Sequence, residues 1–393
     1  MIIREHWNEW KESGVDDGII NLNVTSLIGD EALEQLLFGL PMTERRNDSR
    51  LRDKWLSRYA HVLDGGGWWV SGLDPHNGWQ PMEWGRFKPN APRIDPDKGK
   101  AIKYESPPKV GNRVTYFDVP PHIWDRVAKR YGIKRYHSPL ALRLQDRSHP
   151  VSFWEWVQQH PEIPLVLTEG EKKAACLLSL GFVAIALPGI WNGRVGQKDF
   201  DERLHPDLLP MAQPERKFSI LFDYETKPKT CYALFQAAVR TARVIEQAGS
   251  AGEIALLPGP ERGVDDFVSA RRQEAALLLQ SILDDALSRS DYQARYRLSR
   301  RGLGKYRPQV TVNVPYISEA VRLPESGLVG FRSDMGTGKT ELLKRWREAH
   351  PELRFLNNGH RVNLLKNLAQ RLNTEMYSAV AYGDLSLPSA LST

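Results

Sequence analysis

Cysteine is scarce in this chain of 393 residues, which has only Cys176 and Cys231. The two form no Cys-x-x-Cys pair and no Cys/His cluster, so a zinc ribbon is excluded and a reducing compartment is favoured. No apolar run reaches the ~18 residues that a membrane-spanning helix needs. The N-terminal stretch MIIREHWNEW also lacks the apolar core of a signal peptide. We therefore expect a cytoplasmic protein that has no membrane partner.

Charge of one sign is not in large excess either. The chain has 54 Lys and Arg residues against 48 Asp and Glu, a formal net charge of +6. This mild basicity is compatible with a polyanionic partner but does not establish one. The length allows two or three domains, each large enough to bury a core of its own.

The first part of the chain changes character along its length. Residues 1–60 mix charged and apolar positions as helices do, and residues 121–160 return to that pattern. Between them, residues 61–125 are rich in glycine, proline and aromatic residues, which favours short strands and ordered loops. We therefore expect an α+β, aromatic-rich domain over residues 1–160.

Strands and helices are expected to alternate over residues 161–275. The apolar runs predict strands at 165–168, 183–187, 218–222 and 253–257, and amphipathic stretches predict helices at about 171–179, 201–211 and 230–247. This alternation is typical of an α/β, Rossmann-like fold with a parallel sheet covered on both faces. A helix over 271–290 and a basic linker are expected within 276–325, and a second α/β unit begins at about 326.

Carboxylates follow three of the four predicted strands. Glu169 ends the first, Asp223 and Glu225 follow the third, and Asp265 and Asp266 follow the fourth. Ligands of open parallel sheets bind at the carboxyl ends of the strands. Carboxylates gathered there repel one another, and a divalent cation such as Mg²⁺ relieves that cost. The sequence thus predicts a magnesium site, with plain solvated acids as the alternative.

Basic and aromatic residues supply candidates for binding nucleic acid. Lys172 and Lys173, in the first turn of the predicted helix, would either contact phosphate or form a solvated helix face. Upstream, cations are interleaved with aromatic residues that could stack on bases. The candidates there are Arg86, Lys88, Lys103 and Tyr104. The adjacent Trp68 and Trp69 are expected to point to opposite faces of a strand, with one inside.

A glycine-rich loop precedes a predicted helix in the last unit. The stretch SDMGTGKT runs from Ser333 to Thr340 after apolar residues expected to form a strand. In such loops the backbone N–H groups cradle the phosphates of ATP, a function that Gly336 and Gly338 permit. Lys339 would reach the β- and γ-phosphates, and the Thr340 hydroxyl would contact Mg²⁺. A further strand and helix are expected in the stretch LRFLNNGHRVNLLKNLAQRL.

The carboxylate pattern resembles the Toprim domain, the metal-binding fold of bacterial-type primases, type IA and II topoisomerases and some nucleases. Glu169 matches its glutamate, Asp223 its first aspartate, and Asp265 or Asp266 a later acid; Glu225 stands where a second aspartate is usual. The resemblance implies general acid/base catalysis by the glutamate and magnesium held by the other acids. The stretch KYESPP is also similar to one that precedes Toprim in bacterial-type primases.

Taken as a whole, the chain resembles cyanobacterial-type plasmid replication proteins. These combine a Toprim domain of the DUF3854 type with a C-terminal helicase-like ATPase. The resemblance implies a DNA primase-type nucleotidyltransferase that uses DNA, nucleotides, Mg²⁺ and ATP, and a natural protein longer than this chain. Two alternatives are a non-catalytic, origin-binding replication initiator and a Toprim nuclease. A topoisomerase is disfavoured, because no domain carrying a tyrosine nucleophile is recognisable.

Overall fold

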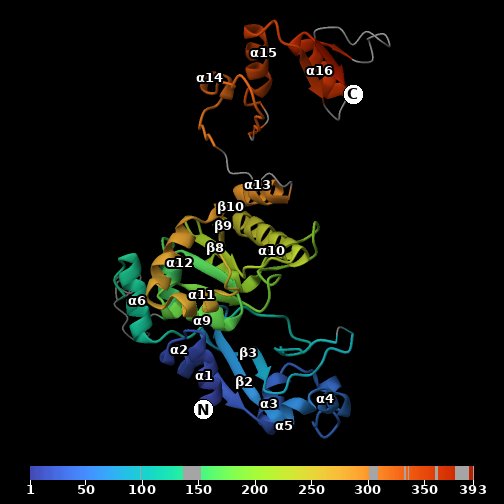
Figure 1. Ribbon diagram of the computed structural model, residues 1–393. Helices are drawn as coiled ribbons and strands as arrows, with labels where there is room; N and C mark the ends of the chain where they lie inside the picture. Colours follow the sequence, from blue (N-terminus) through green and yellow to red (C-terminus); the bar gives the residue numbers. More distant parts are fainter. Residues whose placement is uncertain are drawn as a thin grey trace. The chain divides into compact units, whose positions relative to one another are not determined.

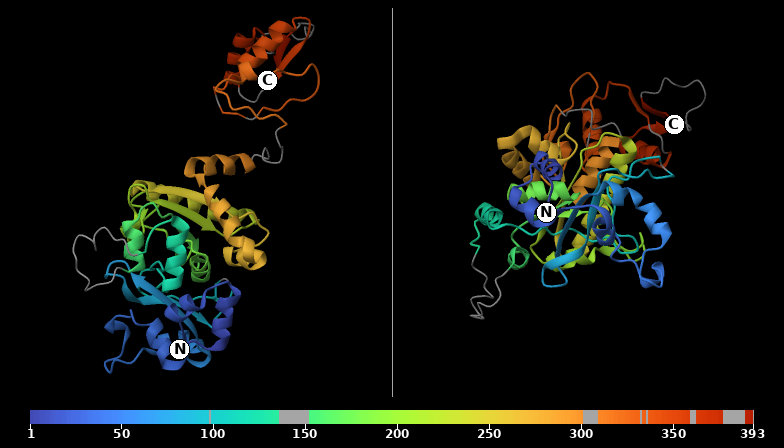
Figure 2. Two further views of the ribbon diagram at one scale, coloured as in Figure 1. Left: turned by 90° about the vertical axis from the view of Figure 1, so that its left-hand side faces the viewer. Right: turned by 90° about the horizontal axis from the view of Figure 1, so that it is seen from below.

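The computed structural model describes residues 1–97, 99–135, 152–300, 309–331, 333–334, 336–358, 362–376 and 389–392. The chain forms two compact units, Met1–Leu303 and Gly304–Thr393 (Figure 1, Figure 2). Among the described residues, no helix is both long enough and apolar enough to cross a membrane.

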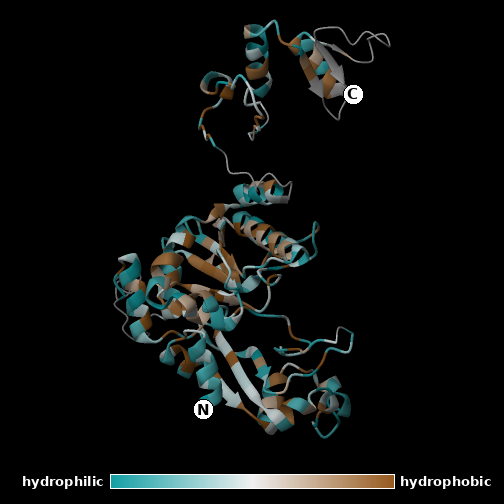
Figure 3. Ribbon diagram, in the orientation of Figure 1, coloured by the Kyte–Doolittle hydropathy of each residue, from teal (hydrophilic) through white to brown (hydrophobic). Residues whose placement is uncertain are grey.

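A five-stranded sheet forms the centre of the first unit. Its order is β10(Leu287–Ser288), β9(Ala251–Leu256), β8(Lys217–Phe222), β4(Leu165–Glu169) and β5(Ala184–Leu187). Four strands are parallel, and only β10 pairs antiparallel, with β9. The parallel strands β4, β5 and β8 are mostly apolar and so mostly brown in the hydropathy colouring (Figure 3), and nearly all of their residues are buried. The predicted α/β fold with a mostly parallel sheet is confirmed.

Helices cover both faces of this sheet. α9(Glu171–Ser179) packs on β4 and β5 with α11(Val264–Arg271) beside it, whereas α10(Pro228–Gln247) packs on β8 and β9 with α13(Arg289–Arg300). The chain runs outward from β4 to β5, then returns past β4 to β8. The strand order therefore reverses between β4 and β8, and this point is where open α/β sheets bind their ligands.

One predicted helix of this unit, 201–211, was wrong, and another, 271–290, is shorter than predicted. Residues 201–211 form the end of the hairpin β6(Arg194–Val195)–β7(Arg203–Leu204) and a 3₁₀ helix, η2(Pro206–Met211), because Pro206 and Pro210 interrupt α-helical hydrogen bonding. Residues 271–290 contain η3(Arg272–Glu274), α12(Ala275–Asp284) and the edge strand β10. The left-handed backbone of Arg272, with φ of 44°, ends α11.

The N-terminal region is built on the antiparallel sheet β1(Val24–Leu27)–β2(Gly67–Asp74)–β3(Gln80–Pro89). Helices form within 1–60 and 121–160, as the mixed patterns predicted, while 136–151 lie outside the described residues. These helices are α1(Arg4–Glu12), α2(Asp17–Asn23), α3(Gly29–Leu36), η1(Met42–Glu44), α4(Asp53–Arg58), α5(Ala60–Gly65), α6(Pro121–Tyr131) and α8(Phe153–Gln159). The hydroxyl of Ser152 accepts from Glu155 N, while the Glu155 carboxylate accepts from Ser152 N, a capping box that fixes the start of α8.

Strand β2 is buried on both of its faces. Trp68 packs into the large core that also contains Trp10 and Trp154, whereas Trp69 packs into a second core with Trp55 and Phe87. Both indoles are inside, at 0% and 5% exposure. The expectation that only one would be buried was wrong, because helices α3, α4 and α5 cover the face of the sheet that the sequence pattern left open.

The N-terminal region and the five-stranded sheet share one core. Thr115 exchanges backbone hydrogen bonds with Ala186 of β5, at 2.9 and 3.2 Å, and the neighbouring Tyr116 accepts one from Leu73 of β2 at 2.7 Å. One continuous hydrophobic cluster runs from Trp10 to Leu279. The segment around Thr115 therefore joins the two sheets of the unit.

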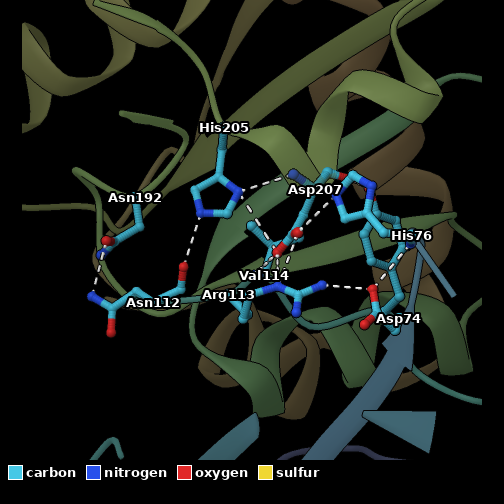
Figure 4. A network of polar contacts seen from close by, with 9 residues as sticks. Asp74, His76, Asn112, Arg113, Val114, Asn192, His205 and Asp207 are labelled. Atoms are coloured by element: carbon cyan, nitrogen blue, oxygen red, sulfur yellow. Dashed lines mark hydrogen bonds and ion pairs between the residues drawn. The ribbon is translucent and has the colours of Figure 1, made fainter. Parts of the chain in front are cut away.

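A buried carboxylate strengthens this connection (Figure 4). Asp207 of η2 is 2% exposed, and both of its oxygens accept from Nε of Arg113, at 2.9 and 2.8 Å. It also accepts from Val114 N at 3.0 Å, and Nε2 of His76 lies 3.2 Å away. Arg113 in turn donates to Asp74 at the end of β2, at 2.7 Å. The network holds the ends of β2, the 112–116 segment and η2 together.

The second unit contains a small parallel sheet of order β11(Phe355–Asn358), β13(Ser389–Ser392), β12(Glu375–Met376). Its helices are α14(Ile317–Ala320), α15(Lys339–Ala349) and α16(Val362–Leu372), so the strand and helix predicted after the glycine loop are confirmed. The strand expected before that loop is not formed at 327–331, where Leu328 is fully exposed and pairs with no strand. Of the predicted basic linker, 292–300 belong to α13, while 301–308 lie outside the described residues.

Candidate active site

Glu169 and Asp223 lie at the carboxyl ends of adjacent strands, where the strand order reverses. Glu169 is the last residue of β4, and Asp223 directly follows β8. Gly170 then turns the chain into α9 with φ of 99°, a conformation that favours glycine, although a Cβ there would meet no atom within 4 Å. The sheet topology therefore brings these two predicted carboxylates together.

Two cations from other elements pair with Asp223. Nζ of Lys173 forms a short ion pair with Oδ1 of Asp223. On the other side, Nε of Arg262 lies 3.9 Å from Oδ2 of Asp223, and its Nη2 lies 3.6 Å from Oε2 of Glu225. The side chains of Lys173 and Asp223 are only 19% and 17% exposed. Lys173 is therefore part of the site and not a solvated helix face.

Gly263 leaves room for this lysine. A Cβ at position 263 would lie 2.9 Å from Cε of Lys173 and 2.3 Å from Oδ1 of Asp265, both closer than real Cβ contacts. The loop that carries Gly263 is held to the end of β8 by a hydrogen bond of 2.8 Å from Tyr224 N to Arg262 O. The absence of a side chain at Gly263 thus lets three segments converge on Lys173.

The two acids Glu169 and Glu225 differ in their electrostatics. Burial raises the pKa of Glu169; Lys173 opposes the rise, while the charge of Asp223 adds to it. The pKa of Glu225 is lowered instead, mainly because its Oε1 accepts from Lys227 N at 3.0 Å and Thr226 N at 2.8 Å. Of the two acids, Glu169 therefore accepts a proton more readily, and Glu225 keeps its charge to lower pH.

Asp265 and Asp266, which the sequence left undistinguished, have different environments. Oδ2 of Asp266 accepts from Gly263 N at 3.1 Å and so caps the start of α11. Oδ1 of Asp265 is buried and has no hydrogen-bond partner. Its charge helps to raise the pKa of the buried Tyr104 and Cys176, for which burial is the main cause. Of the two, Asp265 has the carboxylate oxygen left over for a ligand.

The donor set at this edge fits one kind of magnesium site. Over the described ranges, no three or more His, Cys, Asp or Glu side chains are grouped so that they could hold a metal ion. Proteins commonly bind Mg²⁺ through only one or two carboxylates and complete its shell with water and substrate phosphates. Glu169 and Asp223 supply two hard oxygen ligands of that kind. The residues fit magnesium brought with a nucleotide, but they do not form a cage made by the protein alone.

Lys88 and Lys172, both predicted to bind nucleic acid, have a partner within the protein. Glu9 of α1 receives Lys88 at 2.7 Å, Lys172 at 3.0 Å and the Trp68 indole N–H at 3.0 Å. Burial alone would raise the pKa of Glu9, but these hydrogen bonds lower it to about 2. Sequence reasoning missed Glu9, since no local pattern marks an acid 163 residues from its partner Lys172.

Arg86 connects β3 to the same edge of the large sheet. Its Nη1 donates to Pro188 O, just after β5, at 2.9 Å and lies 3.4 Å from Oε1 of the buried Glu171. The guanidinium also stacks over the Tyr104 ring, 4.7 Å from its centroid. Lys103 is exposed. Together with Glu9, Arg86 holds the N-terminal region on the first turn of α9.

In the second unit, the lysine of the glycine loop turns back over that loop. Nζ of Lys339 donates to Oγ of Ser333 at 2.9 Å and to Asp334 O at 2.6 Å. Gly336 and Gly338 both have φ of 82°, and α15 begins directly after Gly338. The helix N-terminus and the ammonium group thus adjoin one loop, an arrangement that binds phosphate. Arg332 and Met335 of this stretch lie outside the described residues.

Comparison with known proteins supplies a domain but no activity. The chain is 36% identical over 390 residues to an uncharacterized protein of the cyanobacterium Picosynechococcus sp., a match that covers 96% of this chain and 37% of that protein. The chain therefore spans little more than a third of the relative's length. No solved structure matches it. Residues 153–275, which contain the sheet edge described above, match the model of a domain of unknown function, and this part of the chain is a DUF3854 domain.

Proposed function

We propose that this chain is part of a plasmid DNA replication protein with primase-type nucleotidyl transfer at the β4–β8 edge. The proposal is carried by one observation, the placement of Glu169 and Asp223 at adjacent strand ends where the strand order reverses. Two carboxylates at such a point, one with a raised pKa, are what a magnesium-dependent phosphoryl-transfer site requires. Its partners are a single-stranded DNA template and nucleotides.

The side chains divide this work between them. Glu169, whose pKa is raised, takes the proton as a 3′-hydroxyl oxygen bonds to the α-phosphorus of a nucleoside triphosphate and pyrophosphate leaves. Asp223 would hold Mg²⁺ together with the phosphates of the nucleotide, and Mg²⁺ when bound polarises a phosphoryl oxygen. Lys173 and Arg262, which neutralise Asp223 in the free protein, then face the phosphates of the nucleotide. Asp265 would orient a metal-bound water.

The glycine loop of the second unit would bind ATP for a helicase-like activity. Lys339 would exchange its contacts with Ser333 and Asp334 for the β- and γ-phosphates, and the hydroxyl of Thr340 would contact the Mg²⁺ of the nucleotide. Such an ATPase would separate the strands of the plasmid so that the first unit can use one of them as template.

A primer-synthesis assay tests the proposal. The purified chain is incubated with single-stranded DNA, labelled nucleotides and MgCl₂, and the expected products are short oligonucleotides. Asp223→Asn and Glu169→Gln should lower their yield at least 100-fold, because each removes a charged oxygen from the reacting centre. Glu253→Gln, in β9 and paired with Lys217 at 3.1 Å, is the control that should leave it unchanged. The absence of product from wild type, or full activity in Asp223→Asn, would overturn the proposal.

A non-catalytic replication initiator is the second candidate, and one observation favours it. Lys173 and Arg262 already neutralise Asp223, as they would in a site that serves only to stabilise the fold. If the protein is an initiator, wild type and Asp223→Asn should bind origin DNA equally well, and neither should incorporate nucleotides. A nuclease would instead cut supercoiled plasmid with Mg²⁺ in the same reactions, so one set of samples separates the three functions.

A further inference from the structure

A second group of charged side chains lies beyond the end of β5. Residues 188–205 leave the sheet after β5, form the β6–β7 hairpin and pack against α10. Trp191 of this segment is 42% exposed, although most tryptophans of the first unit are buried. A half-exposed indole, with an apolar ring and a polar N–H, is a common ligand-contacting feature.

Three arginines surround one buried carboxylate beside this tryptophan. The Glu202 side chain is 2% exposed, with Nε of Arg194 at 3.0 Å and Nη2 of Arg243 at 2.5 Å. Nη2 of Arg240 makes an even shorter ion pair with the same carboxylate. One negative charge thus faces three positive ones. The nearby acids Asp199 and Asp201 are exposed and have cations of their own, Lys198 at 3.9 Å and Arg203 at 3.5 Å, so they do not offset this excess.

The cluster has donors that the protein does not use. Nη2 of Arg194 and Nε of Arg243 are buried without a hydrogen-bond partner. Burial, and then the repulsion of Arg240, lower the pKa of Arg194 to about 10. An anion with several oxygens that binds Arg240 and Arg243, whose side chains are 19% and 38% exposed, would offset the repulsion between the guanidinium groups.

The arginines and the indole are placed to act on one ligand. The guanidinium carbons of Arg194 and Arg240 lie 4.9 and 5.8 Å from the Trp191 ring centroid. Nη1 of Arg194 also donates to Trp191 O at 3.2 Å, which fixes the loop relative to the cluster. A π-face for a base beside cations for phosphates is the combination by which proteins bind single strands. Bases of a duplex are paired and stacked, so this ring suits an unpaired base.

We propose that Trp191, Arg240 and Arg243, with Arg194 behind them, form a binding site for single-stranded nucleic acid. It deepens the proposed function and rests on it for the role of the strand as template. The segment begins at the carboxyl end of β5, and Glu169 of β4 pairs with Leu187, the last residue of β5. A strand bound at Trp191 therefore lies at the edge of the sheet that carries Glu169.

Fluorescence anisotropy of a labelled oligo(dT) of about 15 nucleotides, without Mg²⁺, tests the site in the whole chain. Trp191→Ala should weaken binding about 5- to 150-fold, the range for loss of one stacked base, and Trp191→Phe should retain most of the affinity. Arg240→Ala should weaken binding and reduce the salt dependence by about one phosphate contact. Arg289→Ala is the matched control: it removes a charge that pairs with Glu246 of α10 at 2.7 Å, away from any indole.

Melting curves show whether each variant is folded, and Arg240→Ala keeps the test valid if Trp191→Ala does not fold. Weakening confined to Trp191→Ala and Arg240→Ala supports the site. Equal affinity of Trp191→Ala, Trp191→Phe and wild type, or an unchanged salt dependence in Arg240→Ala, overturns it, as does a wild type that binds no oligonucleotide. Primer synthesis is scored separately, so strand binding without synthesis would overturn the proposed chemistry but not this site.

Discussion

Replacing Lys173 by methionine tests whether its ammonium group occupies the position that a Mg²⁺ ion would take at the candidate active site. The change keeps a long, apolar side chain in the gap beside Gly263 but removes the ammonium group that pairs with Asp223. Asp223 then loses its shortest ion pair, and the charge of Lys173 no longer offsets the repulsion between Asp223 and Glu169. Lys172→Met is the matched control, because the adjacent lysine pairs with Glu9 instead.

The size of the effect follows from the exposure of the pair. Removing one partner of a fully buried ion pair costs about 3–5 kcal/mol, and exposed pairs contribute at most about 1 kcal/mol. Because Lys173 and Asp223 are 19% and 17% exposed, their pair lies between these limits. We expect Lys173→Met to lower the free energy of unfolding by about 2–3 kcal/mol, which lowers Tm by roughly 4–10 °C.

Magnesium should restore about half of this loss. In the variant Mg²⁺ binds the two carboxylates without competition, and at ten times its Kd it stabilises the fold by about 1.4 kcal/mol. In wild type it must displace Lys173 first, so the gain in Tm is smaller. Thermal melts of the three proteins from 0 to about 20 mM MgCl₂ measure both effects.

Two results would refute this reasoning. One is an equal Mg²⁺-dependent rise of Tm in wild type, Lys172→Met and Lys173→Met, which would mean that the ion binds elsewhere. The other is a Lys173→Met protein as stable as wild type without Mg²⁺, since the ion pair would then contribute nothing. Adding Asp223→Asn to Lys173→Met should abolish the Mg²⁺ effect.

Three further predictions follow from other residues. Because the pKa of Glu169 is raised, its ionisation destabilises the fold as pH rises above the ordinary Glu range, so Glu169→Gln should have a higher Tm than wild type at pH 7 but not at pH 4. The pKa of Glu225 is lowered instead, so Glu225→Gln should have a lower Tm than wild type at pH 7. The opposite order of Tm values in pH-dependent melts would contradict both predictions. Lys339→Ala should weaken binding of a fluorescent ATP analogue by about 10-fold or more, whereas Lys344→Ala, on the same helix, should not. An equal loss of affinity in both variants would rule out the glycine loop as the ATP-binding site. Arg216→Met should lower the free energy of unfolding in urea by about 3–5 kcal/mol, because the fully buried guanidinium donates to the backbone O atoms of residues 157, 160 and 163. A loss below about 1 kcal/mol would show that those carbonyl groups find other partners.

The parallel sheet and its acidic edge could be predicted because their signals are local. The short run Leu165–Thr168 before Glu169, and the run Phe218–Phe222 before Asp223, suffice to place both carboxylates once parallel strands are assumed. Their order in the sheet could not be read from such runs. It was supplied by the pairing of β4 with both β5 and β8.

The partners of the charged residues could not be predicted in the same way. Lys172 and Lys173 are adjacent in sequence, yet one pairs with Glu9 of α1 and the other with Asp223 after β8. Which partner each finds depends on tertiary packing, which a pattern of neighbouring residues does not contain. The hairpin around Glu202 was missed for a related reason, since its short strands β6 and β7 leave no periodic signal.

The backbone bridge between Thr115 and Ala186 bears on how the DUF3854 domain can be studied. β5 is the outermost strand of its sheet, and these hydrogen bonds protect its free edge. A protein limited to residues 153–275 would expose the unpaired amides of β5 together with the apolar surface that Trp79 and Phe117 normally cover. Such an edge recruits further strands, so the excised domain is expected to self-associate into aggregates. Soluble preparations for biochemistry should therefore retain the N-terminal residues.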